Sequence, residues 1–310
     1  MAEETEIQIV LDLDEAQAAS LDTHSLVNIA NVLSYELYHF GELSGEEKRL
    51  DIAIDRLVAI SRTFSDLKLA ESQIRSFADE VSAIKSLIAK VLEEHPNLKT
   101  QSDASESIAN MASIFEILLK WVDEIIERTE APFTWKSYAI QQLQENYTKV
   151  LGAIERNSKG RYRIIYNIAA QHPKDYYVDF KIDSFQSPVI KMPPVFIDVM
   201  RDLIANARKY TAPGGRISAG IWADQNELVL SVEDSGYGIP KDEIKRIVGF
   251  GQRGSNVQTI RTMGAGLGLT KAYYLTKKMN GRMWIRSEEG NGTRVKISLP
   301  RPQEDPSIYT

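Results

Sequence analysis

The spacing of apolar residues divides the chain into two parts of different character. Over residues 21–130, apolar residues recur at intervals of three and four with almost no glycine or proline, a pattern typical of amphipathic helices. Three helical segments are expected, at about residues 21–40, 46–94 and 105–130. Ser44 and Glu47 have the spacing of a capping box, which predicts that a helix begins there. The first part is therefore predicted to be a helical bundle or a long hairpin.

The second part alternates between apolar and polar residues over short runs, which is typical of β-strands. Five strands are expected, at about residues 176–182, 216–223, 227–234, 282–287 and 294–299. Helices are expected up to about residue 154 and at about residues 194–210 and 267–279, and residues 130–137 are interpreted as a hinge. The predicted fold class is α+β, with an N-terminal helical bundle or hairpin followed by a C-terminal α/β sandwich.

Composition narrows the range of functions. The 310 residues suffice for about two domains, and the net charge of -6 without a basic stripe argues against nucleic acid as a partner. The chain has no cysteine, which excludes disulfides and thiolate chemistry. No apolar run is long enough to span a membrane, so a soluble, cytoplasmic chain is expected.

Three segments of the second part carry candidate chemistry. In "RDLIANARKYT", Asp202, Asn206 and Lys209 share one face of the predicted helix, which suits a magnesium-bound polyphosphate. In "VEDSGYGIP", Asp234 follows a strand and is placed to accept a hydrogen bond from an exocyclic amine. In "MGAGLGLTKAYYL", alternate glycines lead into a helix, where backbone amides form an anion site. Taken singly, each segment is equally explained by a polar helix face, a common turn or a flexible loop.

The order of these segments resembles the GHKL ATPases and, within them, the sensor histidine kinases. "DLIANARKYT" is similar to their N box, "DSGYGIP" to their first glycine box, "GFGQRGSN" to their phenylalanine box and "GAGLGL" to their second glycine box. The resemblance covers about residues 133–300. It implies four regions: an acidic segment 1–20, a helical dimerisation and phosphoacceptor region 21–132, an ATP-binding domain 133–302 and a tail 303–310.

The resemblance also implies roles for individual residues. Asn206 would hold Mg²⁺ and Lys209 would reach the phosphates of ATP, while Tyr210 would stack on adenine and Asp234 would accept its amino hydrogen bond. The remaining nucleotide-binding positions are Gly236, Gly238, Phe250, Arg253, Gly264, Gly266, Leu267, Gly268 and Thr293. Residues 249–263 would form a lid over ATP.

Asp202 departs from the histidine kinases, which commonly carry asparagine at that position. It would either bind Mg²⁺ directly or act as a base toward water, as in other branches of the family.

The resemblance gives a meaning to a histidine near the start of the chain. "HSLVNIANVL" is similar to an H box, in which His24 would accept the phosphoryl group and Asn28 would position a water molecule. In most family members an acid follows the histidine, whereas here Ser25 does. His39 is a less favoured acceptor.

The function implied is that of a two-component histidine kinase, which would autophosphorylate His24 from Mg-ATP and pass the phosphate to an aspartate of a response-regulator receiver domain. The expected partners are a second copy of the chain, bound through the helical region, that receiver domain, and a separate or missing sensor module. Two alternatives stay open. One is a GHKL protein serine kinase similar to the dehydrogenase kinases, which the acid at Asp202 favours. The other is an ATP-binding scaffold or phosphatase with weak autokinase activity, which Ser25 favours.

Overall fold

The computed structural model divides the chain into two compact units. One unit contains residues 1–12 and 133–310, and the other contains residues 13–132. The structure describes residues 3–62, 67–131, 133–156, 158, 160–185, 187–260 and 266–302. Within helices, the side chains of several positions, including 22–26, 28 and 29, lie outside this description. We refer below to the helical unit (residues 13–132) and the sheet unit (residues 1–12 and 133–310).

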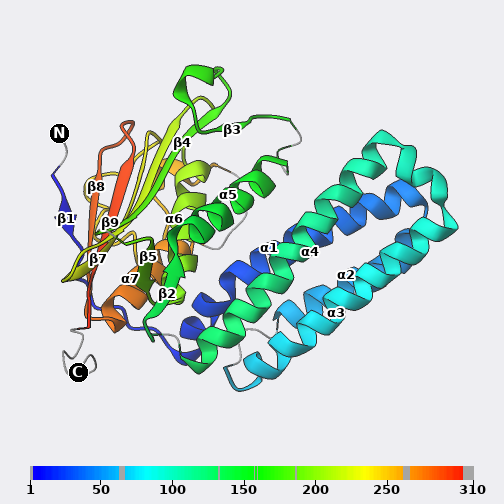
Figure 1. Cartoon of the computed structure of the whole chain (residues 1–310), viewed down its shortest axis with the longest axis horizontal. Helices are drawn as coiled ribbons and strands as arrows, with labels where there is room; N and C mark the ends of the chain where they lie inside the picture. Colours follow the sequence, from blue (N-terminus) through cyan, green and yellow to red (C-terminus); the bar gives the residue numbers. More distant parts are fainter. Residues whose placement is uncertain are drawn as a thin grey trace. The chain divides into compact units, whose positions relative to one another are not determined.

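The sheet unit is built on a seven-stranded sheet (Figure 1). Its strands, in spatial order, are β1 (Thr5–Glu6), β8 (Arg282–Ser287), β9 (Thr293–Pro300), β7 (Glu227–Asp234), β6 (Arg216–Ala223), β4 (Tyr176–Ser184) and β3 (Ile164–Ile165). The pairs β3–β4 and β4–β6 are parallel and the others are antiparallel. The five predicted strands are all present, because alternation along each one buries one face, as at Ile217, Ala219 and Ile221 of β6.

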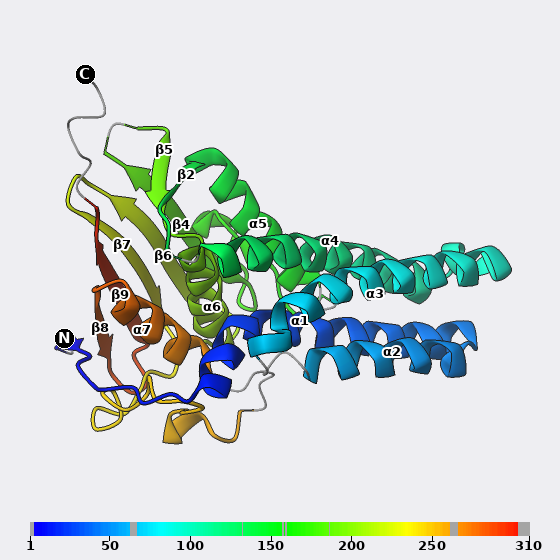
Figure 2. The same ribbon diagram turned by 90° about the horizontal axis from the view of Figure 1, so that it is seen from below.

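Three helices cover one face of this sheet: α5 (Ile140–Arg156), α6 (Val195–Lys209) and α7 (Gly268–Lys278) (Figure 2). Their apolar side chains and the buried face of the sheet form one core. A small second sheet pairs β2 (Lys136–Ala139) with β5 (Val189–Met192), so part of the predicted hinge is a strand. Short 3-10 helices occur at η2 (Pro96–Thr100), η3 (Ile168–Ala170) and η4 (Ser255–Val257). The predicted α+β fold class is confirmed, with an α/β sheet unit that matches the predicted sandwich.

The acidic N-terminal segment differs from its prediction as a region of its own. Its β1 pairs with the edge strand β8, and Ile7 is fully buried in the core of the sheet unit. The Tyr273 hydroxyl of α7 donates a hydrogen bond of 2.7 Å to the Ile9 carbonyl, and Glu6 forms an ion pair with Arg282. Residues 1–12 thus complete one edge of the sheet, and the chain then continues into the helical unit.

The helical unit is a four-helix bundle made within one chain. Its helices are α1 (Glu15–Ser44), α2 (Glu47–Arg62), α3 (Leu67–Glu94) and α4 (Ser102–Glu130). Each helix packs on its neighbours in sequence, and α4 also packs on α1, which closes the bundle around a core that includes Leu33, Phe40, Phe77 and Val122. The long helical segment predicted at residues 46–94 consists of two helices, α2 and α3.

The ends of α1 follow from local capping. Asp14 and Gln17 form a capping box at its start. At its end, Gly45 adopts a left-handed conformation with φ of 72°, which ends the helix at Ser44. The Ser44 hydroxyl donates to the Phe40 carbonyl at 2.7 Å instead of capping the next helix. The predicted capping box at Ser44 is thus wrong, although a helix, α2, does begin close by at Glu47.

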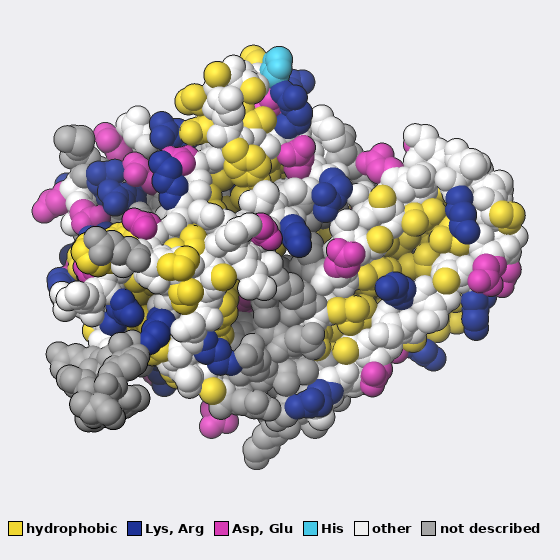
Figure 3. Space-filling view, viewed as in Figure 1, with side chains coloured by type: hydrophobic (Ala, Val, Ile, Leu, Met, Phe, Trp, Pro, Cys, Tyr) yellow, Lys and Arg dark blue, Asp and Glu magenta, His cyan; other side chains and the backbone are white. Residues whose placement is uncertain are grey.

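Charges of both signs are spread over the surface. On the face seen in Figure 3, Lys and Arg side chains alternate with Asp and Glu side chains over both units. In the described part of the chain, no helix is both long enough and apolar enough to cross a membrane.

Candidate ATP-binding site

A pocket in the sheet unit brings together residues from α6, β7, β9 and the segment that leads into α7. Of the predicted nucleotide-binding residues, those that line it are Asn206, Tyr210, Asp234, Gly238, Arg253, Gly266, Gly268 and Thr293. These positions lie up to 87 residues apart in the sequence, from Asn206 to Thr293. The sequence therefore located one pocket from motifs that are separate along the chain.

Much of the pocket wall is apolar, and the motif analysis missed this part. The apolar lining comes from α6, from two strands and from the lid and its flanks: Leu203, Ala207, Val232, Ile239, Ile247, Val257, Leu269 and Val295. Such a wall suits a flat aromatic ring, because binding removes the apolar surface of both the ring and the wall from water. A few polar groups then fix the orientation of the ring. The only signal in the sequence for these residues is their membership of core-facing helices and strands.

Asp234 is the main polar group of the apolar wall. It ends β7, where it lies opposite Thr293 of β9, and its Oδ1 accepts a hydrogen bond of 2.8 Å from the Gly236 amide. Burial raises the pKa of the Asp234 carboxyl to about 6, although hydrogen bonds from the amides of Gly236 and Thr293 oppose this. A largely buried carboxylate of this kind gains from any ligand that donates a hydrogen bond to it.

The two glycines of the first glycine box allow close backbone contacts. A Cβ atom on Gly236 would lie 2.2 Å from the Tyr210 carbonyl oxygen, and one on Gly238 would lie 2.0 Å from the Glu288 carbonyl oxygen. Gly238 also has a φ of 66°, which side chains disfavour. Gly236 itself does not line the pocket, but it fixes the turn that places Asp234 and Gly238 there.

The far end of α6 supplies positive charge. Burial lowers the pKa of Lys209 to about 8, and the neighbouring cations Arg253 and Arg208 lower it further. The Lys209 ammonium lies 5.4 Å from the centre of the Tyr210 ring. Lys209 is close to the pocket without lining it, and its grouping with Arg253 favours an anionic ligand that offsets their mutual repulsion.

The lid segment is described up to residue 260, and it is held at several points. Glu243, which is buried, accepts a hydrogen bond of 2.9 Å from the Ser255 amide, and this bond lowers the pKa of the Glu243 carboxyl. The Asn256 side-chain amide donates to the Gly238 carbonyl at 3.1 Å. Gln252 and Gly254, which the motifs did not single out, line the pocket together with Arg253.

The other predicted lid and glycine-box residues differ in their burial and in whether they line the pocket. Phe250 is half-buried and does not line the pocket, and Leu267 is buried next to the start of α7. Gly264 lies outside the described residues. Gly266 lines the pocket with a φ of 76°, and Gly268 begins α7.

The start of α7 lies directly against α6. A Cβ atom on Gly268 would lie 2.8 Å from the Asn206 side-chain nitrogen, so any other residue here would displace the Asn206 amide group. The Thr270 hydroxyl, fully buried, donates to the Gly249 carbonyl at 2.8 Å and joins α7 to the start of the lid. The first turn of α7 is therefore fixed between the Asn206 side chain and the lid, where its amides suit a phosphate group.

Asn206 fits the magnesium ion that this kind of site uses. It lines the pocket beside Gly268, and an amide oxygen is the kind of hard ligand that Mg²⁺ prefers. Asp202, one turn earlier in α6, has its Oδ2 atom 3.4 Å from the ammonium of Lys271 in α7. The sequence analysis did not single out Lys271.

The phosphoacceptor candidates lie in the helical unit. His24 and Asn28 belong to α1, but their side chains lie outside the described residues. His39, also in α1, has its Nδ1 atom 3.9 Å from Glu42. Their roles therefore stay predictions.

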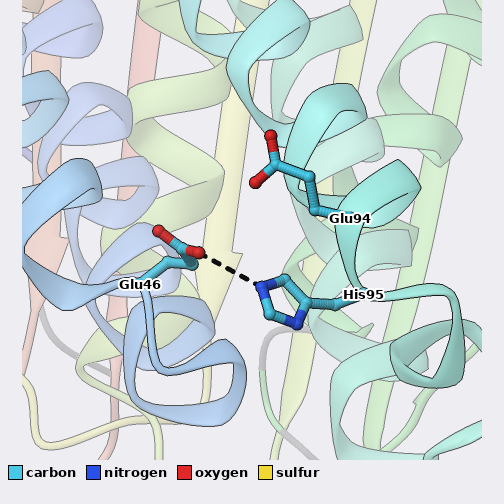
Figure 4. A group of neighbouring side chains, drawn as sticks. All are labelled: Glu46, Glu94 and His95. Carbon is cyan, nitrogen blue, oxygen red and sulfur yellow. Dashed lines mark hydrogen bonds and ion pairs between the residues drawn. The ribbon is translucent and has the colours of Figure 1, made fainter.

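A second group of titratable side chains lies at one end of the bundle. His95 Nε2 is 3.1 Å from Glu46 Oε1, and Glu94 is close by (Figure 4). Arg49 contacts Glu94 at 2.6 Å and lies 3.8 Å from Glu46. Because the Arg49 guanidinium pairs with both carboxylates, this group is best explained as an ion-pair network that joins the α1–α2 turn to the end of α3.

The fold and the pocket together define the class of this domain. Residues 193–303 match the family described as histidine kinase-, DNA gyrase B-, and HSP90-like ATPase. This part of the chain thus matches the GHKL ATPases, as its motifs predicted, and the pocket lies largely within it.

Individual relatives are named as kinases. Sensor histidine kinase WalK of Bacillus subtilis (strain 168) is 23% identical over 265 residues, which cover 81% of this chain and 40% of WalK. Sporulation kinase E of the same organism is 25% identical over 275 residues, which cover 83% of this chain and 35% of that protein. The solved catalytic domain of histidine kinase ThkA aligns with a TM-score of 0.38 and 17% identity, covering 55% of this chain and 99% of that one. The chain spans less than half the length of the two curated relatives.

Proposed function

We propose that this chain is the catalytic part of a two-component histidine kinase. In this proposal it binds Mg-ATP in the sheet unit, transfers the γ-phosphoryl group to His24 of α1, and passes it to an aspartate of a response-regulator receiver domain. The observation that carries the proposal is the pocket that joins Asp234 and an apolar wall to Asn206 and the glycine turn of α7. The two relatives named as kinases support it, because they align over more of the chain than residues 133–310 contain.

Different residues of the pocket would bind the different parts of the nucleotide. Adenine would lie against the apolar wall and Tyr210, with its amino group donating a hydrogen bond to the Asp234 carboxylate. The phosphates would lie at the first turn of α7, with Lys209 and Arg253 offsetting their charge. Asn206 would hold Mg²⁺, which when bound neutralises charge on the phosphates.

The transfer itself is a substitution at phosphorus. A neutral imidazole nitrogen of His24 attacks the γ-phosphorus, the bond to the oxygen that bridges the β- and γ-phosphates breaks, and ADP leaves with that electron pair. The neutral ring is the dominant form near pH 7, so the nucleophile is available. The phosphorylated ring is at first an imidazolium, and it becomes neutral when its other nitrogen releases its proton to solvent.

Radiolabelled ATP tests the proposal directly. The full chain is incubated with γ-labelled ATP and magnesium, and the product is exposed to acid or alkali. We expect label that is stable to alkali and labile to acid, and we expect it to be lost in His24→Ala but kept in the matched control His39→Ala. Label that persists in His24→Ala would exclude His24 as the acceptor.

The same assay distinguishes the alternative functions. Acid-stable label on serine of an added protein would support a serine kinase. Bound nucleotide without any label would support a scaffold or phosphatase. Either result would contradict the proposed autokinase.

We also propose that two copies associate through the helical unit. Four helices of one chain already bury a common core, so the contact would use the outer faces of the bundle. On those faces Tyr35, Tyr38 and Ile52 are 60%, 52% and 59% exposed. The particle mass in solution, measured by light scattering, tests this association.

A further inference from the structure

A lysine is buried between the two helices that carry the phosphate end of the site. Lys271 of α7 is only 1% exposed, and its ammonium lies 3.4 Å from a carboxylate oxygen of Asp198 and 3.4 Å from one of Asp202. A buried ammonium is costly unless it is paired, and these two carboxylates pair it. Lys271 therefore bridges two carboxylates, one turn apart, on α6.

The charges around Lys271 balance. Asp198 also contacts Arg201 at 3.1 Å, and the side chains of both are less than a tenth exposed. These four groups are two carboxylates and two cations, so their own charges cancel. The seam is thus an electrostatic contact of defined geometry and not only an apolar one.

This seam continues into the nucleotide pocket. Along α6, Asp198, Asp202 and Asn206 follow each other at intervals of four residues, and Asn206 is the one that lines the pocket. Along α7, Gly268 contacts Asn206 and Lys271, one turn later, contacts Asp202. The position of the first turn of α7 relative to Asn206 therefore depends on the bridge made by Lys271.

We propose that Lys271 is a positioning residue for the phosphates of ATP. Its bridge to Asp198 and Asp202 holds the first turn of α7 against Asn206, and Asp202 acts through this bridge instead of as a magnesium ligand or a base. The proposal deepens the proposed function and rests on it only for the identity of the ligand as ATP.

Different residues are assigned to the adenine and to the phosphates of the nucleotide. Adenine is assigned to Asp234 and the apolar wall, whereas Lys271 contacts Asp198 and Asp202 and does not line the pocket. Loss of the bridge should therefore weaken ligands that carry phosphates and leave adenosine unaffected. A role in general stability would weaken both.

The experiment compares the affinities of ATP and adenosine, each with magnesium, by calorimetry on the full chain. The variants are Lys271→Met, Asp202→Asn and the double variant, with Lys278→Met as control because Lys278 is an exposed lysine of the same helix. We expect Lys271→Met to bind ATP about tenfold more weakly, with adenosine unchanged within about twofold. Lys278→Met should match the unaltered chain.

The double variant tests whether Asp202 acts through Lys271. It removes one charge of each sign and leaves the Asp198–Arg201 pair, so it should fold even if the unbalanced Lys271→Met does not. We expect its loss of ATP affinity to equal that of Lys271→Met, because the two residues act as one unit. Additive losses from the two single variants, or an equal loss for adenosine and ATP, would overturn the proposal.

Failure of the inference and failure of the proposed function are distinguishable. A chain that binds ATP as expected but forms no phosphohistidine would contradict the kinase and leave the role of Lys271 intact. Normal formation of phosphohistidine, together with unchanged ATP affinity in the double variant, would support the kinase and contradict the role of Lys271.

Discussion

Replacing Asp234 by asparagine should make the nucleotide-free chain more stable and weaken its binding of ATP. The side chain is largely buried at the end of β7, and burial raises the pKa of its carboxyl from 3.8 to about 6. Asparagine has nearly the same shape and keeps one oxygen for the Gly236 amide, which donates to Asp234 at 2.8 Å. It has one acceptor oxygen fewer for the Thr293 amide, so the charge-related gain estimated below is an upper bound. The substitution therefore removes the buried charge while preserving the local turn.

The pKa shift gives the size of the effect. A tenfold change in an ionisation equilibrium corresponds to about 1.4 kcal/mol, so a rise from 3.8 to about 6 corresponds to about 3 kcal/mol. Because the folded chain binds this proton more tightly than the unfolded chain, the stability contributed by Asp234 falls as pH rises from about 4 to about 6. Above that range the full cost is present, and Asp234→Asn relieves it.

Urea unfolding of the nucleotide-free chain at two pH values measures this cost. We expect Asp234→Asn to gain up to about 3 kcal/mol at pH about 7.5 and roughly half of that at pH about 5. Glu233→Gln is the matched control, since Glu233 is the exposed neighbour in the same strand and its change should stay within about 0.5 kcal/mol. In a separate titration, Asp234→Asn should bind ATP at least about tenfold more weakly.

Two results would refute this reasoning. An Asp234→Asn variant no more stable than the unaltered chain at the higher pH would show that the carboxylate is not destabilised by burial. A gain of equal size at both pH values would show that the gain has another origin.

Two further predictions concern the backbone of the sheet unit. Gly236→Ala should lose ATP binding in calorimetry and lower the free energy of unfolding, because its Cβ would lie 2.2 Å from the Tyr210 carbonyl oxygen. Gly220→Ala is the control, since the nearest atom to its Cβ would be 3.7 Å away. If Gly236→Ala is tolerated as well, the turn can move. Ile7→Ala should lower the free energy of unfolding of the sheet unit by about 2 to 5 kcal/mol in urea, because Ile7 is fully buried, whereas the same change at the exposed Val10 should have little effect; equal effects would contradict the packing of β1.

Local signals in the sequence predicted the parts of the site that depend on backbone geometry. Gly238 and Gly266 adopt left-handed φ values, and Gly268 leaves room for Asn206, so the glycine positions reflect real steric needs. The strands that end at Asp234 and begin at Thr293 were predicted from alternation alone. Residue types and their order therefore sufficed to locate the polar side of the pocket.

Contacts between distant segments could not be predicted in this way. Lys271 and Asp198 are 73 residues apart, and their ion pair exists only because α6 and α7 lie side by side. On its own, Lys271 reads as one more lysine of a helix that also carries Lys277 and Lys278. Strand β1 likewise has only two residues, which is too short to recognise from the sequence. It becomes visible only through its pairing with β8, which lies near the other end of the chain.

The strand β1 has a practical consequence for dividing this chain into fragments. The chain enters the helical unit after residue 12 and leaves it before residue 133, so the bundle is an insertion in the sheet unit with two covalent crossings. A fragment that begins at residue 133 would lack β1 and uncover the hydrogen-bonding edge of β8, which invites aggregation. Expression of the nucleotide site alone therefore calls for an internal deletion, with residues 1–12 rejoined to residue 133 by a designed linker. For the same reason, proteolysis at one crossing would nick the chain without releasing either half.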